Sequence, residues 1–372
     1  MMDVIQMART SLASIALLSC TWFGAVPQCA TAGERPVGKL RWKFHVGYRA
    51  YLAATEGVIY AASPTGCTDY VPCGPPARLF ALDGKTGRQK WVLEDVGDDS
   101  APVIADGVVY QSGGSLYAVN AETGRVEWSL KPTSGWVMHS PAIAGGTIIF
   151  WEVQALIPLG FFGGTLRAVD LKTRIEKWRF SIDRGIVSSP VAADGMIFVA
   201  TIPGDPSMFG GCLYALDALT GQARWEFGVA GAAPAVSGGL VYYAGRDGIL
   251  YVLYAQTGKK VWQFGNASAM ASVNVVGKGL VYVMSYEQIC AIDPKTRRQT
   301  WQVKTNTNGS ASTVANGVVY VGSPNKHLYA LSAKSGREIW KLKMSDYVVS
   351  NPVLANGTLY VASSEGYVYA VK

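Results

Sequence analysis

Hydrophobic and polar positions alternate in short runs along most of the chain, and one phrase returns at intervals of 37 to 50 residues. Two clear copies are Leu79-Phe-Ala-Leu-Asp83…Thr86-Gly87…Trp91 and Leu213-Tyr-Ala-Leu-Asp217…Thr220-Gly221…Trp225. Alternation of this kind predicts short, half-buried strands. One position of the phrase is always tryptophan, and it is filled by Trp42, Trp91, Trp128, Trp178, Trp225, Trp262, Trp301 and Trp340.

Two more strand signals separate successive phrases. The first is a Ser/Ala-Pro segment such as Ser189-Pro190, and the second is a Val-Tyr run such as Val109-Tyr110. An Asp-Gly or Asn-Gly turn such as Asp106-Gly107 lies between them, which is a strong hairpin signal because glycine accepts positive φ. Each unit is therefore predicted to contain four antiparallel strands, A to D, with the tryptophan on strand D. Eight such units bury both faces only when they are stacked radially, so the pattern predicts an all-β, eight-bladed β-propeller.

The two ends of the chain complement each other. The last copy, Val368-Tyr-Ala-Val371, stops before its tryptophan, and the missing tryptophan is Trp42 in Lys39-Leu-Arg-Trp42. We expect residues 39–46 to pair beside residues 367–372, so that N- and C-terminal strands share one blade and the ring closes without an exposed edge.

The repeated residues are expected to have structural roles. The Asp and Thr of Asp-x-x-Thr-Gly can hydrogen-bond the backbone of the C–D turn, and the glycine takes its left-handed position. A tryptophan in every unit is expected to wedge between adjacent blades, with its N–H bonded to one partner.

The N-terminal region has the features of an export signal. An apolar stretch covers residues 11–26, and Ala30-Thr31-Ala32 fits a cleavage site, so we assign residues 1–32 to a signal peptide, 33–38 to a short N-terminal segment and 39–372 to the propeller. The alternative is a lipoprotein acylated at Cys20, because Leu17-Leu-Ser-Cys20 loosely resembles a lipobox. No other stretch is long and apolar enough to span a membrane. We therefore expect an exported protein, periplasmic or extracellular, with no transmembrane segment in the mature chain.

Export implies an oxidising compartment, which bears on the cysteines. Cys67 and Cys73 lie six apart in a Pro/Gly-rich segment and are predicted to form a disulfide. Cys212 and Cys290 stand in strand-like contexts, where buried thiols are favoured over a second bridge.

Composition narrows the class of function. Hydrophobic types make up 49% of the chain, which excludes disorder. The net charge of +7 is mild and scattered, and it does not favour a nucleic-acid partner. Basic residues gather on the C–D turns and D strands, where solvated turns are the favoured explanation and a basic underside facing an anionic membrane is the alternative.

Three long insertions point to one face. They lie between strands B and C, over residues 60–79, 150–166 and 198–213, in blades 1, 3 and 4. B–C and D–A connections share one face of a propeller, here called the top face, and long loops on a rigid scaffold are where binding usually resides. The alternatives are loops that pack over one another and a small-molecule pocket. The predicted partner-binding residues are Trp136, His139, Trp151, Glu152, Leu156, Phe161, Phe162, Asp205 and Phe209.

Catalytic motifs are missing from the sequence. The three histidines, His45, His139 and His327, fall in separate blades without metal-ligand spacing. There is no Gly-x-Ser-x-Gly elbow and no Walker A loop. We predict no catalytic residue and no metal ligand.

The phrase Ala-Leu-Asp-x-x-Thr-Gly-x-x-x-Trp, followed by Asp-Gly-x-x-Tyr, resembles the quinoprotein (PQQ-type) propeller repeat over residues 39–372. Eight blades of minimal size look most like the BamB-type outer-membrane assembly factors. That resemblance implies a non-catalytic scaffold whose partners are proteins of the cell envelope and which supports insertion of β-barrel proteins. We also predict a monomeric propeller and no cofactor.

Two other functions are compatible with the resemblance. One is a quinoprotein dehydrogenase that oxidises an alcohol or sugar with PQQ and Ca²⁺, for which Asp95, Asp98, Asp99 and Glu152 are the available carboxylates. The chain lacks the adjacent cysteine pair typical of those enzymes and the Cys-x-x-Cys-His haem motif. The other is an extracellular sensor propeller.

Overall fold

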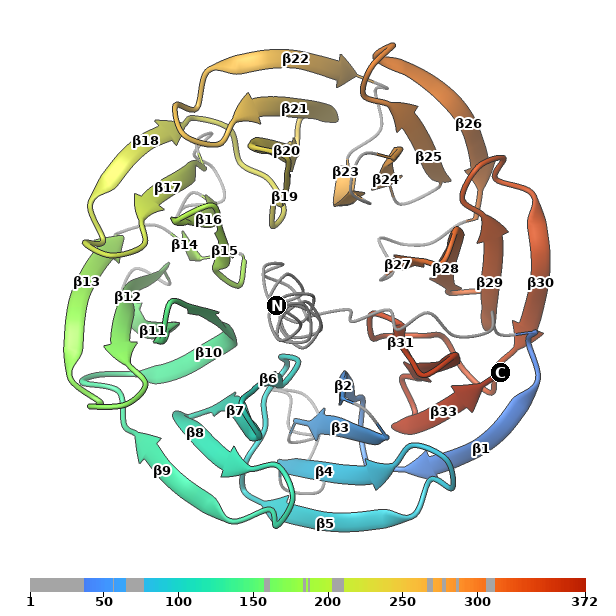
Figure 1. The fold of residues 1–372 in the computed structure, drawn as a ribbon, viewed down its shortest axis with the longest axis horizontal. Helices are drawn as coiled ribbons and strands as arrows, with labels where there is room; N and C mark the ends of the chain where they lie inside the picture. Colours follow the sequence, from blue (N-terminus) through green and yellow to red (C-terminus); the bar gives the residue numbers. More distant parts are fainter. Residues whose placement is uncertain are drawn as a thin grey trace, which may run out of the picture.

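The computed structural model describes residues 37–55, 57–64, 77–156, 161–182, 185–186, 188–202, 211–265, 270–275, 279–285, 288–305 and 312–372. For some strand residues, including 154–156 and 161–162, only the backbone is described. All elements in these ranges are β-strands, and they form eight antiparallel sheets arranged as blades around a central axis (Figure 1). The predicted eight-bladed β-propeller is confirmed.

The first four blades run from the inner to the outer strand in chain order. Blade 1 contains β2 (Tyr51–Thr55), β3 (Val58–Ser63), β4 (Arg78–Asp83) and β5 (Gln89–Glu94). Blade 2 contains β6 (Val103–Ala105), β7 (Val108–Gly113), β8 (Ser115–Asn120) and β9 (Val126–Leu130). Blade 3 contains β10 (Trp136–Ala144), β11 (Thr147–Leu156), β12 (Phe161–Asp170) and β13 (Glu176–Ile182). In blade 4 two short inner strands, β14 (Gly185–Ile186) and β15 (Val191–Ala193), both pair with β16 (Met196–Ile202), which is followed by β17 (Leu213–Asp217) and β18 (Ala223–Phe227).

The last four blades follow the same plan. Blade 5 contains β19 (Ala235–Ser237), β20 (Leu240–Ala244), β21 (Ile249–Tyr254) and β22 (Lys260–Gly265). Blade 6 contains β23 (Met270–Val275), β24 (Val281–Ser285), β25 (Gln288–Asp293) and β26 (Arg298–Lys304). Blade 7 contains β27 (Ser312–Ala315), β28 (Val318–Ser323), β29 (His327–Ser332) and β30 (Glu338–Lys343). Blade 8 combines β31 (Val353–Ala355), β32 (Thr358–Ala362) and β33 (Tyr367–Val371) with β1 (Leu40–His45).

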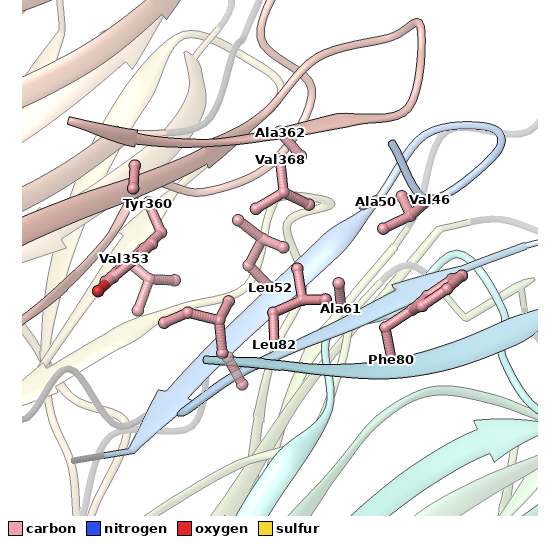
Figure 2. Close-up of a cluster of buried hydrophobic side chains, with 13 residues drawn as sticks. Val46, Ala50, Leu52, Ala61, Phe80, Leu82, Val353, Tyr360, Ala362 and Val368 are labelled. Carbon is pink, nitrogen blue, oxygen red and sulfur yellow. The ribbon is translucent and has the colours of Figure 1, made fainter. Parts of the chain in front are cut away.

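Blade 8 closes the ring as the split repeat predicts. Strand β1 pairs antiparallel with β33, and Figure 1 shows the first strand of the chain lying beside the last. Lys39 N donates to Lys372 O at 2.7 Å, and Lys372 N donates to Lys39 O at 2.9 Å. The apolar cluster in Figure 2 fills the interface that this closure creates, with Leu52 and Leu82 from blade 1 packed against Val368 from blade 8. Clusters of the same kind lie between the other pairs of adjacent blades.

The repeated tryptophans connect neighbouring blades through hydrogen bonds. Trp91 Nε1 donates to Ala121 O of the next blade at 3.1 Å, and the Tyr60 hydroxyl donates to the same carbonyl at 3.1 Å. Four further tryptophans donate to the equivalent carbonyl, namely Trp42, Trp178, Trp225 and Trp301. In all eight outer strands a β-bulge lies one residue before the tryptophan, and such a bulge turns the side chain that follows it.

The C–D turns show the local chemistry expected from Asp-x-x-Thr-Gly. Asp83 Oδ1 accepts hydrogen bonds from Thr86 N and Thr86 Oγ1, both at 2.8 Å. Gly87 has φ +71, so it occupies the left-handed region, and its backbone lies under the Trp42 ring. The Asp, Thr and Gly of these turns therefore have a structural role.

Candidate functional site

The B–C insertion of blade 3 is an extended β-hairpin rather than a loop. Strands β11 and β12 form ten successive pairs, from Thr147↔Asp170 to Leu156↔Phe161, whereas the corresponding strands of blades 2 and 7 form six. Four extra pairs at about 3.3 Å each lengthen the hairpin by about 13 Å on the top face. Leu156, Phe161 and Phe162 belong to its last two pairs, and the described structure extends only to their backbone.

A buried ionic network holds the base of this hairpin. Glu152 is 1% exposed, and its carboxylate accepts from Thr133 Oγ1 at 2.6 Å and forms an ion pair with Arg167. The Arg167 Nε donates to Glu176 Oε2 at 2.7 Å, and Glu176 also pairs with Arg179. The prediction that Glu152 belongs to an accessible binding surface is wrong, because its carboxylate is enclosed and fully engaged. Its role is to fix the hairpin to blade 3.

Trp151 also lies inside the protein. It is 0% exposed, its Nε1 donates to Ser188 O at 3.1 Å, and its ring packs with Ile197 and Val199 of blade 4. The expected exposure of Trp151 on the top face is therefore wrong, since the residue fills the interface between blades 3 and 4. It positions the hairpin relative to blade 4.

Trp136 and His139 remain near the top of blade 3. Trp136 begins β10, is 37% exposed and lies opposite Val153 of the hairpin. His139 adopts φ +63 at an irregularity of β10, and burial lowers the pKa of its imidazole. The His139 carbonyl accepts from Ser112 Oγ at 2.6 Å, so the backbone there is anchored to blade 2. Of the two side chains, Trp136 is the one with substantial exposed surface.

The Ser-Pro segments link the inner ends of neighbouring blades. Ser140 Oγ donates to Ala101 O of blade 2 at 2.8 Å, and Ser140 N donates to Ser189 Oγ of blade 4 at 3.1 Å. On the other side of the ring Thr313 Oγ1 donates to Pro352 O. These bonds join consecutive blades close to the axis, so the top-face elements stand on a rigid ring.

A buried polar cluster lies between blades 1 and 2. Asp98 Oδ1 accepts from Gln111 Nε2 at 3.0 Å and from Ser100 Oγ, and burial raises the pKa of this carboxyl to about 7. Burial, and then the nearby Asp99 charge, raises the pKa of Tyr51 to about 12. The sequence singled out Asp98 and Asp99 but missed Tyr51 and Gln111. Gln111 follows the strand-B tyrosine, where the other units place an apolar residue, and that break in the pattern was the available signal.

The carboxylates considered for calcium do not form one site. Asp98 is bonded to Ser100 and Gln111, and Glu152 is paired with Arg167. Across the parts of the chain that are described, no group of three His, Cys, Asp or Glu side chains is placed to hold a metal ion. The absence of PQQ and calcium stays a prediction.

Some predicted residues lie outside the described ranges. Asp205 and Phe209 are among them, as are Cys67 and Cys73 and the whole segment assigned to the signal peptide. Cys212 and Cys290 are described, and both are buried in different blades. Burial raises the pKa of the Cys290 thiol to about 11.

The fold and its repeat define an eight-bladed β-propeller built from PQQ-type units. The chain belongs to the family described as outer membrane protein assembly factor BamB, which matches residues 30–157, 162–304 and 285–372. A curated relative, the outer membrane protein assembly factor BamB of Yersinia pestis, is 24% identical over 365 residues, covering 91% of this chain and 78% of that protein.

Two solved structures share the architecture. BamB from Moraxella catarrhalis superposes with a TM-score of 0.66 at 17% identity, covering 90% of this chain and 100% of that one. Quinohemoprotein alcohol dehydrogenase from Comamonas testosteroni gives a TM-score of 0.69 at 16% identity, covering 90% of this chain and 76% of that one. At these identities the likeness shows the fold alone, and it does not separate a scaffold from an enzyme.

Proposed function

We propose that this protein is an exported, non-catalytic scaffold of the cell envelope that binds a partner protein through its top face during outer-membrane protein assembly. Membership of the BamB family supports the assembly role. The observation that carries the binding face is the blade 3 hairpin, the longest pairing of two strands in the described structure. The closed ring satisfies its own edges, which supports a monomeric propeller.

The hairpin has the properties of a presenting element. Its base is fixed by Glu152 and Arg167, and Trp151 locks it against blade 4. Within the described residues β10 pairs with β11 only as far as Val153, and β12 pairs with β13 only from Gly164 onward, so the pairs at the end of the hairpin have no further strand of blade 3 beside them. Strand β12 also approaches β14 of blade 4. A rigid base with a projecting ribbon loses little conformational entropy on binding. The sequence places Leu156, Phe161 and Phe162 at its end, and apolar anchors of this size dominate protein interfaces.

The experiment is recovery of envelope partners by the full exported protein. Phe161→Ala with Phe162→Ala should lower partner affinity by about thirtyfold, because two apolar anchors are lost. Leu219→Ala is the matched control, since Leu219 is 79% exposed on a C–D turn of the opposite face. If the double variant keeps every partner, or if Leu219→Ala loses them equally, the assigned face is wrong. A lowered melting temperature with unchanged recovery would show instead that the tip only packs within the protein.

The dehydrogenase alternative is tested separately. The purified protein is mixed with PQQ, Ca²⁺, an alcohol or sugar and a redox dye. We expect no dye reduction above that of the boiled protein, because the chain lacks the adjacent cysteine pair and its candidate carboxylates are bonded elsewhere. Quinone-dependent reduction would favour the enzyme. Tight binding of a small ligand without recovery of any protein partner would favour the sensor.

A further inference from the structure

The outer strands of blades 6, 7 and 8 are unusually basic. We define the basic wall by two side chains on each of β26, β30 and β1, which are Arg298, Lys304, Lys341, Lys343, Arg41 and Lys43. All six are exposed. Within the described part of the chain none of them forms an ion pair. The three strands are consecutive around the perimeter, as Figure 1 shows, so their charges lie on one continuous convex surface.

In blades 3 and 4, by contrast, outer-strand cations are neutralised by acidic side chains. In blade 3 Lys177 pairs with Asp170 at 3.0 Å, and in blade 4 Arg224 pairs with Asp217 at 2.7 Å. Both aspartates belong to the C–D turn that precedes the outer strand. In these two blades an outer-strand cation is therefore paired with the turn aspartate of its own blade.

Two of the three blades that form the basic wall lack that turn aspartate. Blade 7 has Ser332 in the aspartate position, and blade 8 has no continuous C–D turn because the two chain ends meet there. Blade 6 keeps Asp293, whose Oδ1 accepts from Lys295 N at 2.8 Å. The acidic residue on the three outer strands is Glu338. The excess of cations over acidic side chains on these three strands produces a positive electrostatic potential over this side of the perimeter.

The wall also carries aromatic and apolar side chains beside its cations. Lys43 Nζ lies 4.8 Å from the Tyr367 ring centroid, and Lys341 is paired with Tyr329 of the adjacent strand β29 in its own blade. Leu40 and Ile339, on the same two outer strands, are 44% and 49% exposed. Cations interleaved with aromatic and aliphatic groups are the composition of surfaces that lie at a membrane interface.

We propose that the basic wall of blades 6 to 8 binds an anionic lipid surface. This inference rests on the proposed location in the cell envelope, but not on the top-face partner site. The unpaired cations supply attraction to the headgroups, and Leu40 and Ile339 supply apolar contact. A convex, extended wall fits a flat lipid surface, whereas an acidic protein would require complementary shape as well as charge. Binding through this perimeter surface places the axis of the propeller roughly parallel to the membrane plane and leaves the top face open to partners.

The test is co-sedimentation of the mature protein with vesicles. We expect binding to phosphatidylcholine vesicles that contain about one-third phosphatidylglycerol, little binding to phosphatidylcholine alone, and weakening between about 0.05 M and about 0.5 M salt. Lys341→Gln with Lys343→Gln, and separately Arg41→Gln with Lys43→Gln, should each lower the partition coefficient about tenfold or more. The matched control, Arg125→Gln with Lys172→Gln in blades 2 and 3, removes the same charge and should change it less than twofold.

Three results would overturn the proposal. Equal losses in the control and wall variants would show that net charge alone drives adsorption. Binding that does not depend on phosphatidylglycerol would show that an anionic headgroup is not required. Equal affinity for soluble polyglutamate would show that charge without lipid suffices. Partner recovery in detergent extracts separates this site from the proposed function. We expect variants of the basic wall to recover the partner protein in detergent as well as the parent does, and variants of the blade 3 hairpin to bind vesicles as well as the parent does.

Discussion

The indole Nε1 of Trp42, on the outer strand of blade 8, donates a 3.0 Å hydrogen bond to the carbonyl of Gly84 in blade 1. The Tyr360 hydroxyl donates to the same carbonyl at 3.0 Å. One backbone oxygen thus joins the last blade to the first, 276 residues apart along the chain in the case of Tyr360. The joint depends on close approach, because a Cβ on Gly87 would lie 2.6 Å from the Trp42 ring.

Gly87→Ala should therefore destabilise ring closure. Gly87 has φ +71, which costs an alanine about 1 kcal/mol, and displacing the Trp42 ring adds about 1–3 kcal/mol. Gly107→Ala isolates the first contribution, since Gly107 has φ +76 and nothing within 4 Å of the added Cβ. Chemical denaturation of both variants measures the difference. Equal free energies of unfolding would show that the ring contact contributes nothing.

Breaking the buried pair beneath the hairpin should cost more than breaking an exposed one. Arg167→Met leaves the 1% exposed Glu152 carboxylate without its cation, which should lower the free energy of unfolding by about 3–5 kcal/mol. Adding Glu152→Gln should recover part of that loss because the uncompensated charge is removed. Arg224→Met is the control, as Arg224 is 55% exposed in its pair with Asp217 and should cost about 0.5 kcal/mol. A double variant as unstable as Arg167→Met would contradict this account.

The blade count and the ring closure were predictable because they depend on spacing alone. Eight equivalent tryptophans, with Trp42 supplying the one missing after Val371, require eight units and a shared blade. The glycine and aspartate turns followed from local backbone chemistry, which short sequence patterns record well.

The candidate site was less predictable because it depends on contacts between units. Trp151 stood out as an extra tryptophan, yet it occupies the position after the strand-B aromatic, where Val199 and Val361 are also buried. Counting it within the repeat would have predicted its burial. The pairing of Glu152 with Arg167 depends on the register between β11 and β12, which the sequence alone does not give. The extra length of these two strands was not predicted, because the insertion between them was interpreted as a loop.

Asp98 should make stability depend on pH. Burial raises the pKa of its carboxyl from 3.8 to about 7, so the folded protein holds a proton that the unfolded chain releases near pH 4. Stability is therefore greatest below about pH 4 with respect to this group, and it falls by at most about 4 kcal/mol as pH rises to about 7.

Asp98→Asn should flatten that part of the profile and make the protein more stable than the parent at pH 8. The amide oxygen still accepts from Gln111 and Ser100, so the cluster keeps its hydrogen bonds. Asp99→Asn, the neighbouring exposed carboxyl, should leave most of the slope in place. Denaturation midpoints between pH 4 and pH 8 measure both. An unchanged slope in Asp98→Asn would assign the pH dependence to other groups.

The two tryptophans of blade 3 should separate stability from partner binding. Trp151→Phe loses the bond to Ser188 O and leaves a cavity at a fully buried site, which should cost about 2–3 kcal/mol of folding free energy. Under conditions in which the Trp151→Phe variant is folded, its affinity for the partner should equal that of the parent. Trp136→Ala should behave in the opposite way, since Trp136 is 37% exposed beside the hairpin. It should cost about 1 kcal/mol or less in stability and about 2 kcal/mol in binding, roughly thirtyfold in affinity. Melting curves and quantitative partner recovery on the same preparations give both numbers. If Trp136→Ala recovers partners as well as the parent while Trp151→Phe loses them in the folded state, the partner reads the packing between blades 3 and 4 and not the exposed top of blade 3.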